Sequence, residues 1–306
     1  MLVEVAPVHV TASAPPRRRR PPRLWPLACL LPAIALLIIW IYLPLAQAVE
    51  LSTLRWNLLP TSQPQQVGLD NYARMLQSPA TGAAALRTLG VVLGLCLFTV
   101  VLPVIACFAL QHVGERAGRM LRAVFFLPYI MAPVAVAAIW QWLLDPRGPV
   151  NQLLGTGRNW VHEAGTALAS LVLATGWHVL GFATVIVWAA LTQISGSFQG
   201  AAAIDGATTS QARRWIIVPL LAPTLVFLAL LTFLLGPQWI FPIIDTSTQG
   251  GPTQATTDLY YLLWQLGLTS FDAGASAAAG VLIFAGSAIV AALLTWIGNR
   301  MSAHAR

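Results

Sequence analysis

Six long apolar runs, separated by short polar segments, dominate this sequence. A helix needs about 20 mainly apolar residues to cross a bilayer, and each run reaches that length. The chain is 57% hydrophobic and only 9% charged, a combination that soluble domains do not have. We therefore predict an all-α membrane protein with six transmembrane helices at residues 24–49, 86–111, 121–144, 167–193, 217–244 and 275–299.

The two ends of the chain are polar. Residues 1–23 form an Arg/Pro-rich tail that we predict to be disordered, and residues 300–306 form a short second tail. The first apolar run, which ends near Ala46-Gln47-Ala48, also has features of a cleavable signal peptide. Its apolar stretch is longer than the usual 7 to 15 or so residues, and Trp40 and Tyr42 lie near its far end. We therefore expect an uncleaved first helix and a membrane domain over residues 24–299.

The arginines predict the orientation. Arginine is enriched in loops on the cytoplasmic side of a membrane. If the N-terminus is cytoplasmic, most of the 17 basic residues lie on the cytoplasmic side and most acidic residues lie outside. Six spans then return the C-terminus to the cytoplasm as well.

The residue types exclude several functions. The chain has no lysine, and a P-loop needs one to bind phosphates, so any ATP hydrolysis must belong to a partner. Much of the net charge of +7 lies in residues 17–20 and Arg23, where it is typical of a membrane anchor and not of a nucleic-acid site. Cys29, Cys96 and Cys107 lie in apolar runs without metal-ligand or CxxC spacing, which predicts no metal site.

The apolar runs carry no Asp, Glu or Arg in their interiors. Charges at membrane depth usually mark ion or proton pathways. Their absence argues against an ion-coupled secondary carrier or a channel, which is the main alternative of a different class. No nucleophile motif of a hydrolase is present either. We expect no catalytic residue and no cofactor bound by this chain.

A hairpin between the fourth and fifth runs, at about residues 195–217, is the most informative polar segment. Ala201 to Ile204 favour helix, and Asp205-Gly206 is a turn signal because glycine accepts positive φ angles. Thr208 to Ser210 can cap a second helix. Two short helices on a membrane face predict a docking surface for another protein.

Polar and aromatic side chains inside the later spans predict a solute path. Uncharged hydroxyl-rich solutes are held by aromatic faces and neutral hydrogen-bonding groups. Pro237 and Pro242 predict a broken fifth helix, which membranes tolerate beside a cavity. The aromatic residues are equally typical of an interfacial belt, and the histidine of a bond to a neighbouring helix. The candidates are Trp140, Gln141, Trp177, His178, Gln238, Trp239 and Phe241.

Five short motifs follow one another along the chain. They are Gly68-Leu69-Asp70-Asn71-Tyr72, expected as a short amphipathic helix, Phe126-Leu127-Pro128-Tyr129, Asp205-Gly206-Ala207, Leu220-Leu221-Ala222-Pro223-Thr224 and Gly250-Gly251-Pro252. In order and spacing the chain resembles the MalF/UgpA-like permeases of carbohydrate-type bacterial ABC importers over residues 24–299. The resemblance implies the type I importer, or MetI-like, fold in a bacterial inner membrane.

The resemblance also implies partners and a coupling site. It implies a second, MalG/UgpE-like permease, two ATP-binding subunits that use ATP and Mg²⁺, and an extracytoplasmic solute-binding protein. The solute would be a sugar or a glycerol-phosphate-like compound, with an amino acid or a peptide as the alternative. By the resemblance, the ATPase docks on the loop at residues 200–219, through Gly200, Ala201, Ala202, Asp205, Gly206, Ala207 and Pro219.

One residue departs from the family pattern. Gly200 stands where the family usually has Glu. Glycine inside a helix is less favourable than alanine by about 0.5–1 kcal/mol, and it removes a carboxylate from the docking surface. The partner ATPase or the second permease would have to compensate for this loss.

Overall fold

The computed structural model describes residues 25–59, 61–194 and 196–303, so the predicted tail at residues 1–23 lies outside it. The chain divides into two units, residues up to Gln47 and residues from Ala48 on. The first unit contains α1 (Trp25–Leu37), the π-helical turn η1 (Ile38–Tyr42) and the start of α2 (Leu43–Ser52). This helix is long and apolar enough to cross a membrane between Cys29 and Ser52.

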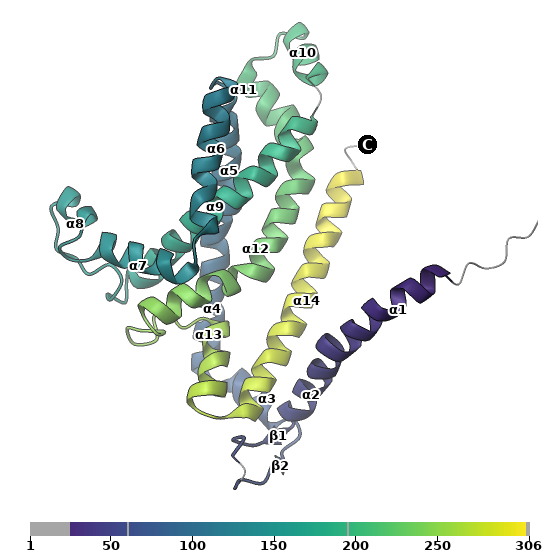
Figure 1. Ribbon diagram of the computed structural model, residues 1–306, viewed down its shortest axis with the longest axis vertical. Coiled ribbons are helices and arrows are strands. Elements are labelled where there is room, and N and C mark those ends of the chain that lie inside the picture. The colour runs from purple at the N-terminus through teal and green to yellow at the C-terminus, as the bar shows by residue number, and fades with distance from the viewer. Residues whose placement is uncertain (1–24, 60, 195, 304–306) are drawn as a thin grey trace, which may run out of the picture. The chain divides into compact units, whose positions relative to one another are not determined.

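The second unit is helical apart from one small ribbon (Figure 1). In that ribbon β1 (Leu54–Arg55) pairs antiparallel with β2 (Gln65–Gln66), Leu54 opposite Gln66. The helices, with π-helical turns marked η, are α3 (Asp70–Gln77), α4 (Pro79–Cys96), η2 (Leu97–Val101), α5 (Leu102–Leu110), α6 (Glu115–Ile130), α7 (Pro133–Leu144), α8 (Pro149–Leu154), α9 (Ala167–Gln193), α10 (Ser197–Ile204), α11 (Thr209–Ala212), η3 (Arg213–Ile217), α12 (Val218–Ser247), α13 (Leu259–Trp264), η4 (Gln265–Thr269) and α14 (Ala273–Ala303).

Within the described residues, five helical stretches are long and apolar enough to cross a membrane. They are Cys29–Ser52, Pro79–Leu110, Ala167–Gln193, Thr209–Ser247 and Ala273–Trp296. A sixth is reached if α6 and α7 count as one span. The predicted all-α membrane class therefore agrees with the structure, and the predicted fourth span at residues 167–193 coincides with α9.

The third predicted span, residues 121–144, is wrong as a continuous helix. The helices on either side of residues 131–132 meet at 101°. Ala132 has an extended conformation, with ψ at 135°, and it immediately precedes Pro133. The proline ring disfavours a helical conformation at the residue before it, and here α6 ends at Ile130, just before this pair. Trp140 and Gln141 consequently lie on α7, beyond the bend.

The predicted break in the fifth helix is also wrong. α12 is continuous from Val218 to Ser247 although Pro223, Pro237 and Pro242 lie inside it. Figure 1 shows the α12 ribbon changing direction along its length. Proline bends a helix without ending it when the neighbouring helices hold both halves in place.

α9 is the central helix of the second unit. It packs against α4, α5, α6, α7 and α12. The approach to α6 is especially close, because a Cβ atom built on Gly181 would lie 1.9 Å from the Phe125 carbonyl oxygen. A Cβ atom built on Gly176 would likewise clash with the Phe98 ring. Small residues at such crossings let membrane helices pack backbone to backbone.

The short helix expected near residue 70 is α3, at the end of the unit where α14 begins. Its Asn71 is buried and donates hydrogen bonds to the carbonyls of Ser52 and Leu54, both at 2.8 Å. Arg74 pairs with Asp272 at 3.1 Å. These contacts attach α3 to the segment before it and to the start of α14.

The close crossing generates a prediction about stability. Gly181→Ala should destabilise the protein by at least the 1–3 kcal/mol or so typical of overpacking, because the clashing atoms are backbone and cannot rotate away. Gly90→Ala is the control, since a Cβ atom there meets no atom within 4 Å. The measurement is the thermal unfolding midpoint in detergent. Equal midpoints for the two variants would contradict the proposed crossing.

Candidate functional site

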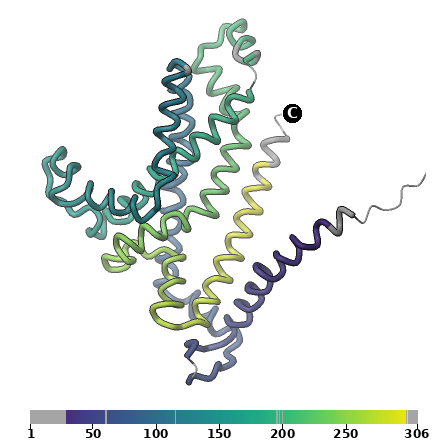
Figure 2. The backbone as a smooth tube through the Cα atoms, viewed as in Figure 1, coloured from purple at the N-terminus to yellow at the C-terminus, as the bar shows by residue number. Residues whose placement is uncertain are grey.

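The hairpin between α9 and α12 consists of two short helices, α10 and α11, as predicted. Figure 2 shows the hairpin at one end of the second unit, with α3 and the connection from α13 to α14 at the other end. The spans α9 and α12 therefore connect the hairpin directly to the interior of the unit.

The turn of the hairpin is fixed by backbone hydrogen bonds. Gly206 has a φ of +79°, a left-handed conformation that side chains disfavour. The amide of Ala207 donates to the Ala202 carbonyl at 2.9 Å, and that of Gly206 donates to the Ala203 carbonyl at 3.1 Å. This pair of bonds is the Schellman motif, which satisfies the last carbonyls of α10.

The second helix begins immediately after the turn. The Thr208 hydroxyl accepts a hydrogen bond from the Gln211 amide, and the Gln211 side chain accepts one from the Thr208 amide. This reciprocal capping box fixes the start of α11. Because both helix ends that flank residues 205–208 are capped, the hairpin has a defined shape.

The base of the hairpin is attached to α5. Arg213 lies 2.9 Å from the His112 ring nitrogen, and its guanidinium stacks over the Phe108 ring at 5.0 Å. A small cleft of about 120 Å³ separates the hairpin from the end of α5. Ala202 and Ala212 are buried against this base, and Pro219 lies in the first turn of α12.

The hairpin exposes large apolar side chains beside polar ones. Ile204 at the tip is 88% exposed, and Phe198 and Trp215 are exposed as well. Gly200 and Ala201 also face outward, and a Cβ atom at Gly200 meets nothing within 4 Å. Exposed apolar side chains gathered on an ordered element are typical of a protein–protein contact.

Two of the predicted solute residues meet between α7 and α9. The rings of Trp140 and Trp177 lie 6.0 Å apart, edge to face. The indole nitrogen of Trp140 is buried and has no hydrogen-bond partner within the part of the chain that the structure describes. A buried donor of this kind usually has a partner, so this N–H can donate a hydrogen bond to a solute or a water molecule.

A second group joins α6, α9 and α12 into one aromatic strip. Tyr129 stacks on Phe182 at 4.9 Å, and Phe182 meets Trp239 at 6.4 Å. The His178 ring centroid lies 5.7 Å from that of Tyr129, and its buried Nδ1 has no hydrogen-bond partner among the described residues. His178 thus contributes to the contact between α6 and α9. We call Tyr129, Phe182 and Trp239 the aromatic strip.

The remaining predicted residues lie elsewhere. Gln141 donates to the Thr246 carbonyl at 3.3 Å, and Phe241 packs against Tyr261 and Trp264 of α13. Gln238 is exposed in a groove of about 410 Å³ beside α13 and α14. Its amide has no hydrogen-bond partner among the described residues, so it does not satisfy backbone groups near the prolines.

Tyr129 and Phe182 were missed by the sequence reasoning. Phe182 follows His178 by one helical turn, so both project from the same face of α9. Tyr129 ends the Phe-Leu-Pro-Tyr motif and lies just before the bend. The four-residue spacing from His178 could have identified Phe182 from the sequence. The stacking of Tyr129 on Phe182 could not be predicted, because it depends on the bend that follows α6.

One buried carboxyl lies in the loop before α13, outside the spans. Asp258 accepts a hydrogen bond from the Tyr261 amide at 2.8 Å and so caps α13. Burial raises the pKa of this carboxyl to about 6, because a charged carboxylate is disfavoured away from water. Asp258 is far along the chain from the hairpin and the aromatic strip, and it serves to fix this loop.

Comparisons with known proteins agree with this arrangement. The family described as "Binding-protein-dependent transport system inner membrane component" matches residues 100–303. The chain is 31% identical over 270 residues to the sn-glycerol-3-phosphate transport system permease protein UgpA of Salmonella typhimurium, covering 85% of this chain and 89% of that protein. It is 30% identical to the UgpA protein of Pectobacterium atrosepticum, covering 84% and 88% of the two chains.

A solved structure has the same fold. It is a bacterial ABC transporter involved in the import of the acidic polysaccharide alginate, and one of its chains superimposes with a TM-score of 0.77 at 22% identity. The match covers 91% of this chain and 96% of that one. The predicted fold of ABC importer permeases is therefore confirmed. The chain belongs to the family of binding-protein-dependent transport system inner membrane components.

Proposed function

We propose that this chain is one of two permease subunits of an ATP-driven importer and carries a sugar or a glycerol-phosphate-like solute inward. The observation that carries this proposal is the hairpin: two capped helices that project an exposed apolar tip from the spans α9 and α12. A separate ATPase would bind this tip, and its movement would pass through the two spans to the solute path.

The arginines of the chain, counted together with residues 17–20 and Arg23, support a cytoplasmic position for the hairpin. Five arginines lie on the hairpin itself or on the start of α6, which follows α5 at the hairpin's base. They are Arg116, Arg119, Arg122, Arg213 and Arg214. The other end, around α3, also carries arginines, and there Arg55 and Arg74 pair with the carboxylates of Asp70 and Asp272. By the positive-inside rule the hairpin faces the cytoplasm, with both chain termini on that side.

The partners follow from this assignment. ATP and Mg²⁺ would be bound by two ATP-binding subunits, because this chain has no lysine for a P-loop. The chain is accordingly not an enzyme by itself. A second permease would complete the pore, and an extracytoplasmic binding protein would deliver the solute. At Gly200 the surface is open, so a partner side chain can approach the place where the family has Glu.

The aromatic strip is the best candidate for the solute path. Aromatic faces bind the apolar faces of sugar rings, and the strip joins three helices that would move relative to one another during transport. The relatives point to the same solute class, since they are named for sn-glycerol-3-phosphate transport. An amino acid or a peptide is the alternative solute. Competition for uptake by a panel of both classes separates the two.

The docking role of the hairpin can be tested at its tip. Ile204→Asp should weaken binding of the ATPase subunits by about tenfold or more, because central apolar contacts contribute most of the energy of an interface. Co-purification of the ATPase and stimulated ATP hydrolysis are the measurements. Leu153→Asp is the matched control, since Leu153 on α8 is 87% exposed and lies away from the hairpin. Equal binding by both variants would exclude the docking role.

The solute path can be tested at Trp239. Trp239→Ala should raise the KM for uptake of radiolabelled sn-glycerol 3-phosphate or of a competing sugar, by about fivefold or more, because a stacking contact is lost. Basal ATP hydrolysis should stay unchanged. Phe227→Ala is the control, because Phe227 lies on the same helix but is exposed on its surface. A normal KM in a well-assembled Trp239→Ala complex would remove the strip from the path.

A further inference from the structure

A half-buried arginine at the base of the hairpin, Arg213, contacts three side chains at the end of α5. Its Nη2 lies 2.9 Å from His112 Nε2 and donates to Gln111 Oε1 at 3.5 Å, and its guanidinium stacks over the Phe108 ring at 5.0 Å. The three contacted residues have the spacing i, i+3 and i+4, which places them on one face of a helix. Among the described residues, no carboxylate forms a salt bridge with Arg213. We call Phe108, Gln111, His112 and Arg213 the arginine clamp.

The clamp requires one protonation state of His112. Arginine has only N–H donors, so the imidazole nitrogen that faces the guanidinium has to accept the hydrogen bond. Nε2 accepts only in an uncharged ring, with the proton on Nδ1. A charged imidazolium would instead place two donors and two positive charges 2.9 Å apart. The clamp therefore closes on an uncharged His112 and opens when that ring gains a proton.

The charges around His112 do not replace this contact. On α5 itself the other titratable group is the thiol of Cys107, which is buried against α9. Arg214 stacks over Trp215 and Arg122 over Trp188, so both guanidiniums are occupied by tryptophans. The charged residues of the hairpin and of α6, apart from Arg213, are Asp205, Arg214, Glu115, Arg116, Arg119 and Arg122. Basic residues predominate here, so a charge on His112 would add to an already positive surface.

The clamp holds one end of a long span that passes beside the aromatic strip. α4, η2 and α5 follow one another over Pro79–Leu110. In the middle of this span, the Thr99 hydroxyl is buried and lies 2.7 Å from the Thr232 hydroxyl of α12. The neighbouring Phe98 ring packs directly against Gly176 of α9. The span thus contacts both helices that carry the hairpin, and Thr232 is about two helical turns from Trp239.

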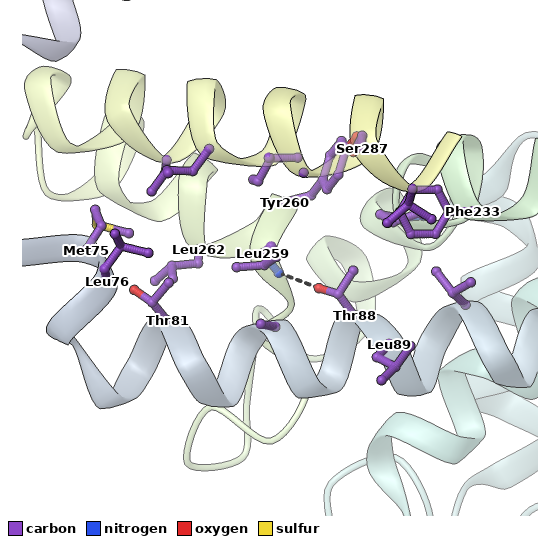
Figure 3. A pocket seen from close by; sticks show the side chains of 18 residues that line it. Met75, Leu76, Thr81, Thr88, Leu89, Phe233, Leu259, Tyr260, Leu262 and Ser287 are labelled. Atoms are coloured by element: carbon purple, nitrogen blue, oxygen red, sulfur yellow. Dashed lines mark hydrogen bonds between the residues drawn. The ribbon is translucent and has the colours of Figure 1, made fainter. Parts of the chain in front are cut away.

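The far end of the same span is attached to the loop before α13 and to the start of that helix. The Thr88 hydroxyl of α4 accepts a hydrogen bond from the Leu259 amide at 3.0 Å (Figure 3). Arg87 donates to the Thr257 carbonyl at 3.3 Å. A span that is fixed at one end and pushed at the other has to tilt. A displacement of the hairpin that passed through the clamp would therefore shift the middle of the span against α9 and α12.

We propose that Arg213 is a positioning residue that passes movement of the hairpin into α5, and that it does so only while His112 is uncharged. This inference rests on the docking role proposed for the hairpin and adds a third span to the two that carry it. Histidine is the side chain whose charge changes between about pH 5 and pH 8. A fall in pH on the hairpin side would open the clamp, so that less solute moves for each ATP hydrolysed.

The first experiment measures uptake of radiolabelled sn-glycerol 3-phosphate per ATP hydrolysed by the complete complex in proteoliposomes. At about pH 8, where histidine is uncharged, Arg213→Gln should lower this ratio by about threefold or more, because a hydrogen bond to α5 is lost. Co-purification of the ATPase should be unchanged. Arg119→Gln is the matched control, because Arg119 of α6 is exposed and has no hydrogen bond or ring contact among the described residues.

The pH profile distinguishes this role from a merely structural one. For the unchanged chain, the ratio should fall by about threefold or more as the hairpin-side pH is lowered from about 8 to about 5.5. His112→Gln offers an acceptor that does not titrate, so its ratio should stay high at both pH values. His162→Gln is the control: this exposed histidine lies in the loop between α8 and α9, and its variant should keep the fall.

A distance measurement tests the clamp without the partners. Nitroxide labels at Val113→Cys and Ser210→Cys report the separation of α5 and the hairpin by electron paramagnetic resonance. The full chain is used in nanodiscs, with its three native cysteines replaced by alanine. The distance distribution should be narrow at about pH 8 and broaden at about pH 5.5. With His112→Gln it should remain narrow at both.

Two results would overturn the proposal. One is the same response of the distances to pH in the unchanged chain and in His112→Gln. The other is loss of ATPase co-purification with Arg213→Gln, because Arg213 would then belong to the docking surface. A failure of the docking role is distinguishable from both: Ile204→Asp would leave ATPase binding unchanged while the distances still respond to pH.

Discussion

The close approach of α9 to α6 at Gly181 is the contact on which the rest of the second unit depends. With no side chain at this position, the Phe125 carbonyl lies directly against the α9 backbone. This close packing of the two backbones brings the Tyr129 ring of α6 onto the Phe182 ring of α9. Phe182 in turn contacts Trp239 of α12. The aromatic strip is therefore a consequence of backbone packing, and a wider crossing would separate its rings.

The same helix links the proposed solute path to the hairpin. α9 carries Phe182 in its middle and leads into α10 at its end, and α12 carries Trp239 and begins at the hairpin's base. Gly206 and the capping box of Thr208 keep the two short helices in one shape. A displacement of the hairpin tip would thus reach both sides of the aromatic strip through two continuous helices. This geometry suits a subunit that converts movement of a partner into access to a solute.

The sequence predicted those parts of the fold that depend on local signals. Apolar runs of sufficient length predicted the spans, and Asp205-Gly206 predicted the hairpin turn, because the left-handed conformation favours glycine. The bend between α6 and α7 was missed, since a proline's effect depends on whether neighbouring helices hold the chain straight. Pro133 ends a helix, whereas Pro237 lies inside a continuous one.

Long-range features had no sequence signal of their own. Gln238 and Trp239 are adjacent in sequence but face different surroundings, a groove beside α14 and the ring of Phe182. The apolar groove between α4 and α14 in Figure 3 depends on side chains far apart in the chain, such as Thr81 and Val290, leaving a space between them. Packing of this kind follows from three-dimensional contacts and not from periodicity.

The most direct test of the account is solute uptake by proteoliposomes that contain the complete complex. The account predicts uptake only when ATP and Mg²⁺ are supplied on the hairpin side and the solute-binding protein on the other side. An imposed ion gradient without ATP should give no uptake. Uptake driven by such a gradient in the absence of ATP would contradict the account and favour an ion-coupled carrier.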